Sequence, residues 1–445
     1  MSTDVDVLVV GGGPAGLAAA IELRRLGATR VVVLEREQQA GGIPRHSDHL
    51  GFGLRDMRRI LRGPAYAARY ARLAKEAGVE VRTGTSVTGW AGPHVLELTS
   101  ADGRMQLGAP AVLLATGCRE RPRAARLVPG SRPLGVLTTG PLQQFVHLHH
   151  QPVGRRAVVV GAEHVSFSAV LTLAHAGART VAMVTDQPRH QTYAPLAWLA
   201  AGRCGVPVLT SSAVTQILGR RRVEAVEVVD LVGGGVRQIA CDTVVFTGDW
   251  IPEHELARSA GLAMDPGTRA PRIDGALRTS APGVFAAGNL LHGAETADVA
   301  ALSGRHAARA VAAFLRSGAW PARSPIAVEC EAPLRWVSPS AIDAAPDAGP
   351  SATARAAADA GPGTTARAAP DALLDAAPDA VPHGHFLLRA GAFSERVILE
   401  VRQDDRRLWQ QRYRRLVPNR SIRASAAWIR EVDPNGGPLR FSVAS

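Results

Sequence analysis

The sequence contains almost no lysine and few aromatic residues. Lys75 is the only lysine among 51 basic residues, so arginine carries nearly all of the positive charge behind a net charge of +12. Aromatic residues make up 4% of the chain, and no run of consecutive basic residues is longer than three. Nucleic-acid-binding surfaces usually gather basic side chains in one place, so we expect no nucleic-acid partner. The preference for arginine, together with abundant alanine and proline, is as typical of a GC-rich gene as of selection for a nucleic-acid-binding surface.

Cysteine is also scarce. Cys118, Cys204, Cys241 and Cys330 are scattered, and the closest pair is 37 positions apart. Without a CxxC or CxxxxC spacing, the chain encodes neither a redox dithiol nor a self-contained zinc or iron–sulfur site. The segment from His147 to His150 has three histidines but no acidic neighbours, so we predict no metal site.

Long apolar runs are absent. No stretch reaches the roughly 18 residues of a membrane-spanning helix, and the N-terminus enters a strand pattern at residues 5–10 with no basic region before it. We therefore expect neither a transmembrane segment nor a signal peptide. We expect a cytoplasmic location. With 46% hydrophobic and 20% charged residues over 445 positions, the chain should fold into two or three domains.

The chain changes character twice. Residues 1–330 alternate strand and helix patterns, which predicts an α/β protein with parallel sheets. Residues 331–384 are rich in Ala, Pro and Asp and predict a flexible linker. Residues 385–445 predict a small β module of about four strands, from apolar runs at 397–401, 408–413, 422–429 and 439–443. This module carries 12 Arg against 6 acidic residues, which would suit docking to an acidic partner.

The first strand leads into a glycine-rich turn. Residues 5–10 are followed by Gly11-Gly12-Gly13-Pro14-Ala15-Gly16, a helix over 17–26, and a second strand over 31–34 that ends at Glu35. In such a unit Gly11 makes the tight turn, Gly13 lets the backbone approach a pyrophosphate, Gly16 lets helix pack on strand, and Glu35 accepts hydrogen bonds from a ribose. The order of these parts predicts a dinucleotide site.

Two later stretches make the pattern more specific. Residues 111–117 and 283–289 are buried strands that end in Ala115-Thr116-Gly117 and Gly288-Asn289. Together with the first loop they resemble the FAD motifs of flavoproteins with two dinucleotide-binding domains, the pyridine nucleotide–disulfide oxidoreductase superfamily, over residues 1 to about 320. Asn289 stands where that family usually has an aspartate for a ribitol hydroxyl, and the helix expected over 296–314 would point its N-terminus at the flavin. The resemblance implies FAD as cofactor, with contacts from Gly11, Gly13, Pro14, Ala15, Gly16, Glu35, Arg36, Gly42, Arg45, Val87, Ala115, Thr116, Gly117, Gly288, Asn289, Thr296 and Ala297.

The same resemblance implies two Rossmann-like domains, the second inserted in the first. The FAD-binding domain would comprise 1–118 and 272–330, and an NAD(P)-like domain would occupy 150–250. There the strand 156–160 and the helix 165–176 are joined by Gly161-Ala162-Glu163-His164-Val165-Ser166. Glu163 and Ser166 replace two glycines, and both the bulk and the charge of Glu163 oppose a pyrophosphate. Binding of NAD(P)H, a purely structural role, or another ligand all stay open.

The residues after Glu35 should border the flavin ring. The run Gly41-Gly42-Ile43-Pro44-Arg45-His46-Ser47-Asp48-His49 resembles the flavin-facing stretch of the family, but Ser47 stands where related flavoproteins associated with glycerol-3-phosphate dehydrogenases carry a cysteine. A thiol mechanism is therefore excluded. The run 132–144 resembles the larger FAD subunit of hydrogen cyanide synthase and opine oxidase. That resemblance implies two partners, a small [2Fe–2S] protein and an amino-acid-oxidase-like FAD subunit.

Two histidines are candidates for catalysis. His46 and His49 would lie beside the flavin and titrate in the right range to move a proton, although each could instead bond only to backbone or flavin phosphate. Arg45 either neutralises the pyrophosphate or binds substrate. Glu295 and Asp298 flank the start of the helix near the flavin, where Asp298 suits capping better than chemistry.

Three functions remain. The favoured one is an FAD-dependent oxidoreductase, a subunit that passes electrons from a small metabolite of the amine, opine, imino acid or glycerol-3-phosphate type to a partner protein or quinone. The alternatives are a stand-alone NAD(P)H-dependent flavin reductase and a non-catalytic FAD-containing assembly or electron-relay subunit. The sequence does not name the substrate.

Overall fold

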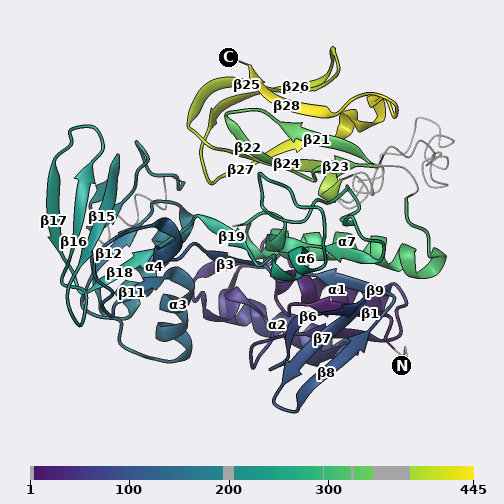
Figure 1. Ribbon diagram of the computed structural model, residues 1–445, viewed down its shortest axis with the longest axis horizontal. Helices are drawn as coiled ribbons and strands as arrows, with labels where there is room; N and C mark the ends of the chain where they lie inside the picture. Colours follow the sequence, from purple (N-terminus) through teal and green to yellow (C-terminus); the bar gives the residue numbers. More distant parts are fainter. Residues whose placement is uncertain (1–4, 194–204, 294, 322–324, 344–380, 445) are drawn as a thin grey trace, which may run out of the picture.

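The first domain is built on a parallel sheet of five strands in the order β20-β9-β1-β2-β5 (Figure 1). In a computed structural model, described for residues 5–193, 205–293, 295–321, 325–343 and 381–444, the short runs of Val and Leu predicted as strands are buried. The strands are β1 (Val7–Val10), β2 (Val31–Leu34), β5 (Glu80–Arg82), β9 (Ala111–Leu114) and β20 (Val284–Ala286). All neighbours run parallel, as the predicted α/β class requires.

Helices cover this sheet, and the same domain contains two smaller antiparallel sheets. Helix α1 (Pro14–Arg25) packs against the long helix α7 (Ala297–Ser317), and α2 (Gly63–Glu76) packs against α1. The remaining elements of this half are η1 (Ile43–His46), the hairpin β3 (Leu50–Phe52) and β4 (Leu61–Arg62), the antiparallel sheet β6 (Ser86–Gly92), β7 (Val95–Ser100) and β8 (Gly103–Gly108), α6 (Glu255–Ser259) and η4 (Gly288–Leu290).

The second domain interrupts the first, as predicted. The chain leaves through β10 (Cys118–Glu120) and returns through β19 (Trp250–Pro252), and these two strands pair antiparallel. The domain begins earlier than residue 150, because β11 (Val136–Thr138) forms an edge of its parallel sheet. That sheet has the order β11-β18-β12-β13-β14. The other elements are η2 (Arg123–Arg126), α3 (Thr139–Gln143), η3 (Gln144–Leu148), β12 (Arg156–Val160), α4 (His164–His175), β13 (Arg179–Val184), β14 (Val208–Leu209), the antiparallel sheet β15 (Ser212–Leu218), β16 (Ala225–Asp230) and β17 (Val236–Ala240), and β18 (Thr243–Phe246).

The C-terminal module is larger than predicted, and the linker prediction is wrong at its start. Residues 326–342 form β21 (Ile326–Cys330), β22 (Leu334–Ser338) and β23 (Ala341–Ile342), which join strands from the end of the chain in two sheets. The cause is local: Leu334 and Val337 are apolar and bury in the same core as Phe386 and Phe441, before the Ala/Pro/Asp-rich composition begins. Residues 344–380 of the predicted linker lie outside the described residues. The module is completed by η6 (Pro382–Gly384), β24 (His385–Ala390), β25 (Ser394–Gln403), β26 (Arg406–Leu416), β27 (Ser421–Ser425), η7 (Ala427–Glu431) and β28 (Leu439–Ala444).

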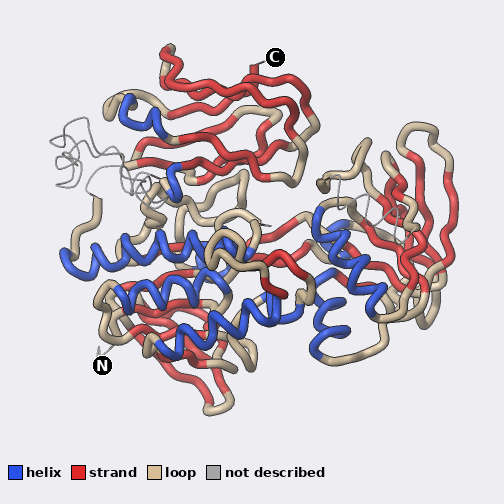
Figure 2. The backbone as a smooth tube through the Cα atoms, turned by 180° about the vertical axis from the view of Figure 1, so that it is seen from behind, coloured by secondary structure: helices blue, strands red, loops and turns tan. Residues whose placement is uncertain are grey.

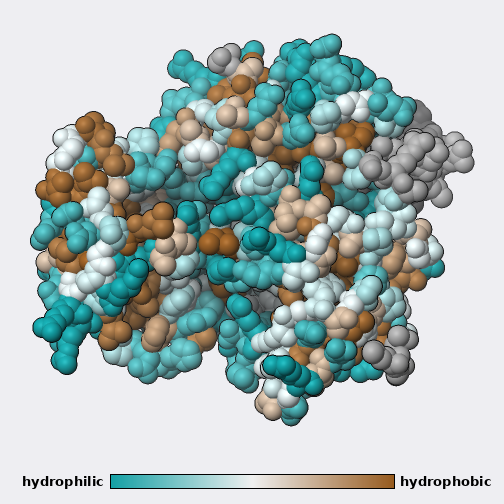
Figure 3. Space-filling model, in the orientation of Figure 1, coloured by the Kyte–Doolittle hydropathy of each residue, from teal (hydrophilic) through white to brown (hydrophobic). Residues whose placement is uncertain are grey.

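The second domain and the C-terminal module both contact the first domain. Figures 1 and 2 show the C-terminal module stacked over α7 and the second domain beside it. In Figure 3 this face is a mosaic of polar and apolar groups, with hydrophobic groups gathered on the second domain, whose exposed apolar side chains include Leu231, Val232 and Val236. In the described part of the chain, no helix combines the length and the hydrophobicity needed to cross a membrane.

Candidate active site: two nucleotide loops and their surroundings

The first glycine loop is as tight as its sequence predicts. Gly11 has a φ of +108°, and a Cβ atom built there would lie 2.4 Å from the carbonyl oxygen of Ala115. A Cβ on Gly16 would lie 1.9 Å from the carbonyl oxygen of Gly11. Any larger residue at either position would push the helix away from the sheet. These glycines thereby place the N-terminus of α1 against the ends of β1 and β9.

The N-terminus of α1 is open. Its N-cap is Gly13, no side chain of the described residues caps the helix, and Pro14 occupies the first turn. The nearest atom to a Cβ built on Gly13 would be the Cα of Gly42, 3.9 Å away. Uncapped N–H groups and the helix dipole together favour an anion. The loop therefore fits a pyrophosphate, with Ala15 in the first turn beside it.

Glu35 is held in position at the end of β2. Its carboxylate accepts hydrogen bonds from the backbone N–H of Gly12 and of Glu37, both at 2.8 Å. Each carboxylate oxygen keeps a lone pair that can accept a ribose hydroxyl. Arg36 is exposed and lies 3.8 Å from Glu253, and Val87 is half-buried in β6. A role for these two in binding the cofactor stays a prediction.

The two later motifs meet the first loop. Ala115 is buried, the hydroxyl of Thr116 donates to the carbonyl oxygen of Glu253 at 2.7 Å, and Gly117 has a φ of +78°. A Cβ on Gly288 would lie 2.6 Å from the Cβ of Ala15, so this motif packs directly on the start of α1. All three stretches thus gather at the carboxyl ends of β1, β9 and β20, the edge where dinucleotides bind in such sheets.

Asn289 is already engaged. Its amide nitrogen donates to the carbonyl oxygen of Glu295 at 3.0 Å, and its carbonyl oxygen accepts from the N–H of Glu295 at 3.2 Å. Asn289 therefore fixes the loop that leads to Thr296, the N-cap of α7, and to Ala297. One N–H and one lone pair remain for a ribitol hydroxyl. Asp298 lies in the first turn and accepts hydrogen bonds from Thr296 and from the backbone N–H of Arg55.

His46 is buried without a hydrogen-bond partner. It is 3% exposed, and neither ring nitrogen has a partner in the described structure. Burial, with Arg45 and His147 nearby, lowers the pKa of His46 to about 4. The imidazole is therefore neutral at pH 7, and the burial that lowers its pKa also makes it a weak proton acceptor. His49 is half-buried, with Nδ1 2.9 Å from the carbonyl oxygen of Leu50. Catalysis by either histidine stays a prediction.

The Gly-Gly turn presses on the open loop. A Cβ on Gly42 would lie 2.9 Å from the Cα of Gly13, so the turn closes one side of the α1 N-terminus. The aliphatic part of Arg45 lies against Gly41, and its guanidinium is 4.0 Å from Glu37. Contact between Arg45 and a pyrophosphate stays a prediction.

The second nucleotide loop is filled by its own glutamate. Glu163 is the N-cap of α4 and forms a capping box with Ser166. Its carboxylate also accepts from the N–H of Ala162 at 3.0 Å, and Ser166 lies 2.7 Å from the hydroxyl of Thr247. The N–H of Ser166 at this N-terminus is therefore bonded to a carboxylate, whose charge opposes a phosphate at the same place. One oxygen of Glu163 is buried without a hydrogen bond in the described structure.

The C-terminal module covers this second loop. Arg420, in the turn between β26 and β27, donates to the carbonyl oxygens of Gln191, at 2.7 Å, and Thr192. Its guanidinium lies 4.4 Å from the ring centre of Tyr193, which stacks on His164 at 4.6 Å. His164 is the first residue of α4. The sequence predicts the turn at 417–420 but carries no signal for this contact.

A second attachment joins the module to the start of α7. Arg389 and Glu295 form an ion pair at 3.0 Å, with side chains 5% and 6% exposed. Arg389 also donates to the carbonyl oxygen of Gly293 at 3.1 Å and lies 5.1 Å from the ring centre of Trp336. The module's arginines are thus partly used inside the molecule. Its charge excess therefore does not by itself indicate an acidic partner.

The cysteines and histidines are also candidates for redox or metal sites. Cys118, Cys241 and Cys330 form no disulfide bond, and Cys204 lies outside the described residues. Within the described ranges, no group of three or more His, Cys, Asp or Glu side chains is arranged to hold a metal ion. His147 instead lies beside His175, with ring centres 5.1 Å apart.

Comparisons with known proteins agree with this geometry. The family model for pyridine nucleotide-disulphide oxidoreductases matches residues 5–304. One of the subunits of the opine oxidase of Agrobacterium tumefaciens is 30% identical over 71% of this chain and 67% of its own length. Ferredoxin–NADP reductase of Ignicoccus hospitalis is 27% identical over 71% of this chain and 99% of its own length.

A solved structure shows the same fold. The thioredoxin reductase of T. acidophilum superposes with a TM-score of 0.59 at 22% identity, over 71% of this chain and all of that chain. The part of the chain beyond the matched region includes the C-terminal module. The open loop, its three converging motifs and these matches agree: the chain belongs to the pyridine nucleotide-disulphide oxidoreductase family and is an FAD-dependent oxidoreductase.

Proposed function

We propose that this protein takes electrons from a small metabolite and passes them to a partner protein or quinone without using NAD(P)H. The observation that carries the proposal is the filled second loop, in which Glu163 occupies the N-terminus of α4. A nicotinamide nucleotide would have to displace a carboxylate that is already hydrogen-bonded and bring its own negative charge beside it. Arg420 and Tyr193 cover the same loop from outside.

FAD, when bound, supplies an acceptor for two electrons from the substrate. The chain's own groups prepare the site. The N-terminus of α7 directs its dipole toward the edge where the three FAD motifs meet, and so stabilises negative charge there. His46 is neutral at pH 7, so its imidazole has one N–H donor and one nitrogen acceptor for hydrogen bonds to a bound cofactor or substrate. The buried pair of Arg389 and Glu295 fixes the segment before α7.

Charged side chains from separate parts of the chain converge near this segment. Burial lowers the pKa of Arg423, and Arg55 lowers it further, whereas Glu295 and Asp298 act in the opposite direction. Arg423 lies in β27, and Arg55 lies in the loop between β3 and β4. Two guanidinium groups beside two carboxylates can receive an anionic group, as in glycerol-3-phosphate, a cationic group, as in an amine, or both, as in an opine. We propose a substrate of the amine, opine, imino acid or glycerol-3-phosphate type.

The relatives support a heteromeric assembly. Besides the opine oxidase protein, the chain is similar to the alpha subunit of sarcosine oxidase of Rhizobium meliloti, at 29% identity over 75% of this chain but only 33% of that protein. It is also similar to the HcnB subunit of hydrogen cyanide synthase of Pseudomonas aeruginosa, at 34% over 31% of this chain. All three are named as subunits. We propose two partners, a small [2Fe–2S] protein and an amino-acid-oxidase-like FAD subunit.

Anaerobic reduction of the flavin tests this proposal. The purified chain, alone and with the products of neighbouring genes, is mixed with amines, opines, imino acids and glycerol-3-phosphate while the flavin absorption is followed. Bleaching by at least one substrate, with reoxidation by the partner or a quinone, is expected. No bleaching by any of them, combined with rapid bleaching by NADH or NADPH, would instead indicate an NAD(P)H-dependent flavin reductase.

A further inference from the structure

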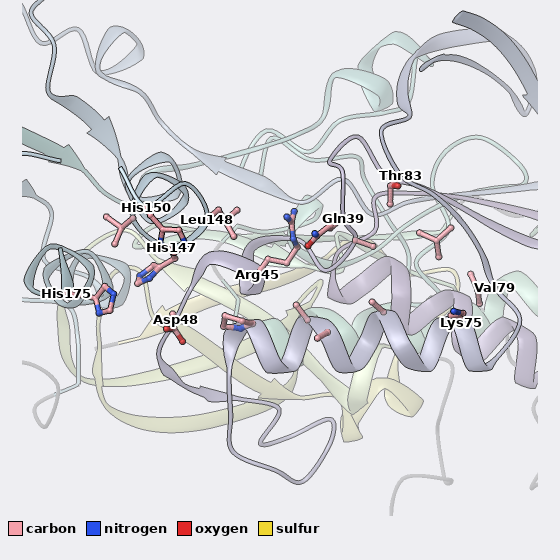
Figure 4. Close-up of a pocket in the computed structure, with 17 residues that line it drawn as sticks. Gln39, Arg45, Asp48, Lys75, Val79, Thr83, His147, Leu148, His150 and His175 are labelled. Carbon is pink, nitrogen blue, oxygen red and sulfur yellow. The ribbon is translucent and has the colours of Figure 1, made fainter. Parts of the chain in front are cut away.

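A cavity of about 930 Å³ lies between α2 and the second domain, next to the turn that leads to Gly41 (Figure 4). One wall is formed by Ala67, Ala68 and Ala71 of α2, with Val79 just before the edge strand β5 and Val81 within it. The opposite end is formed by η3 and by the end of α4. Its volume lies within the roughly 300–1,000 Å³ of small-molecule sites.

This cavity is distinct from the predicted FAD site. Of the residues predicted to hold FAD, only Arg45 lines it in the described structure, whereas Gly13, Glu35, Thr116 and Asn289 do not. The η1 segment separates the two, because it presents Arg45 to the cavity while His46 is buried. FAD bound along the predicted motifs would therefore leave the cavity accessible.

The charged lining is predominantly cationic. Figure 4 shows Lys75, the only lysine of the chain, at one end, His147 and His175 at the other, and Arg45 between them. The side chain of Arg45 is 15% exposed, yet its ion pair with Glu37 spans 4.0 Å. Among the described residues, Asp48 is the only acidic one in the lining.

The charge of Asp48 is already balanced. Its carboxylate accepts a hydrogen bond from the guanidinium of Arg62 at 2.7 Å, outside the cavity lining. Arg45 and Lys75 therefore remain as permanent positive charges above an alanine and valine floor. An apolar floor with separated cations favours a ligand that has both an apolar body and a negative group.

We propose that this cavity is a second ligand site, for an elongated organic anion that carries a phosphate or carboxylate on an apolar body. The ligand lies along α2 with its apolar body on Ala68 and Ala71 and its anionic group at Lys75, while Arg45 lies toward the other end of the body. Arg45 lines the site and is followed in η1 by the buried His46. The proposal does not depend on the electron donor or acceptor, because it concerns a site outside the flavin motifs.

Calorimetric titration of the oxidised, FAD-saturated protein tests the site. AMP is the phosphate probe, decanoate the carboxylate probe, and adenosine the neutral control. Binding of AMP or decanoate with a Kd below a millimolar, and much weaker binding of adenosine, is expected; which anion binds tells phosphate from carboxylate. No heat with either anion at millimolar concentration, or equal binding of adenosine and AMP, would overturn the proposal.

Variants on α2 locate the site. Lys75→Gln should weaken binding by about tenfold, the value of one charge-assisted hydrogen bond. Arg72→Gln removes the same charge from the same helix at an exposed position outside the cavity and should leave Kd unchanged. Ala68→Trp, at an exposed position, should fill the cavity and abolish binding. Equal losses for Lys75→Gln and Arg72→Gln would show attraction to general positive charge and contradict the proposal.

Discussion

The two nucleotide loops of this protein have the same architecture and opposite chemistry. Each follows a buried parallel strand and leads into a helix of 12 residues, α1 or α4. The α1 loop ends at Gly13 with no side-chain cap from the described residues, whereas the α4 loop ends at Glu163, whose carboxylate caps its own helix. One residue at the N-cap thus decides whether the helix dipole is available to a ligand or already satisfied within the chain.

Among these tests, the largest effect is expected when a glutamate like Glu163 is placed at Gly13, in the α1 loop. Gly13→Glu should weaken FAD binding by about 4 kcal/mol, nearly a thousandfold in Kd, from the repulsion of a carboxylate and a pyrophosphate at about 4 Å. Gly13 has a φ of −80° and an open Cβ position, so the fold should survive. The FAD content of the purified variant measures the effect.

Gly13→Gln is the matched control for charge. It has nearly the same bulk as Gly13→Glu and no negative charge, so it should retain more FAD. If both variants lose FAD equally, bulk alone closes the loop, and the electrostatic part of the comparison is wrong.

The pH dependence of stability compares His46, near the α1 loop, with His164, in the α4 loop. The pKa of His46 is lowered to about 4, chiefly by burial, and that of His164 to about 4, by burial and Arg420. Both are at 6.5 when unperturbed, so the unfolded chain binds more protons between pH 6.5 and 4. Stability is therefore retained above pH 6.5 and lost as pH falls toward 4. His46 contributes roughly 3 kcal/mol of this loss.

Unfolding of the FAD-free protein in urea at several pH values measures this dependence. His46→Gln should flatten the slope of stability against pH, and His164→Gln should flatten it less because its ring is less buried. An unchanged slope in His46→Gln would show that the pKa of His46 is the same in the folded and unfolded protein, and would contradict the lowered value.

The smallest effect is expected when Glu163 is removed from the α4 loop and NADH binding is measured. Glu163→Gly should tighten NADH binding by about tenfold, because it removes the carboxylate while glycine at an N-cap costs α4 only a few tenths of a kcal/mol. The double variant with Arg420→Ala should bind tighter still, since the module also covers the loop. Titration of NADH into the FAD-loaded variants measures both. An affinity unchanged in the double variant would show that neither group is the obstacle.

Local sequence patterns predict the two loops but not their surroundings. The strand, glycine turn and helix order identifies both loops, and the replacement of a glycine by Glu163 is evident from local spacing alone. The bonds of its carboxylate within the loop require the fold. The contact of Arg420 with Gln191 joins residues 229 positions apart, and no local pattern encodes such a pairing.

The linker boundary shows a different limit. The average composition of residues 331–384 predicts a linker, and the apolar residues Leu334, Trp336 and Val337 are too few to change that average. All three are buried nevertheless: strands from the end of the chain provide the rest of the core of Leu334 and Val337, and Trp336 stacks on His292. A short strand stabilised by distant partners has no sequence signal of its own.

The most direct test of the account is rapid anaerobic mixing of the FAD-loaded protein with NADH and with NADPH. If Glu163 and the covering module close the second loop, the flavin should stay oxidised over seconds at micromolar nucleotide. Fast and complete bleaching by either nucleotide under these conditions would contradict the account, because it would show that the filled loop still admits a pyrophosphate.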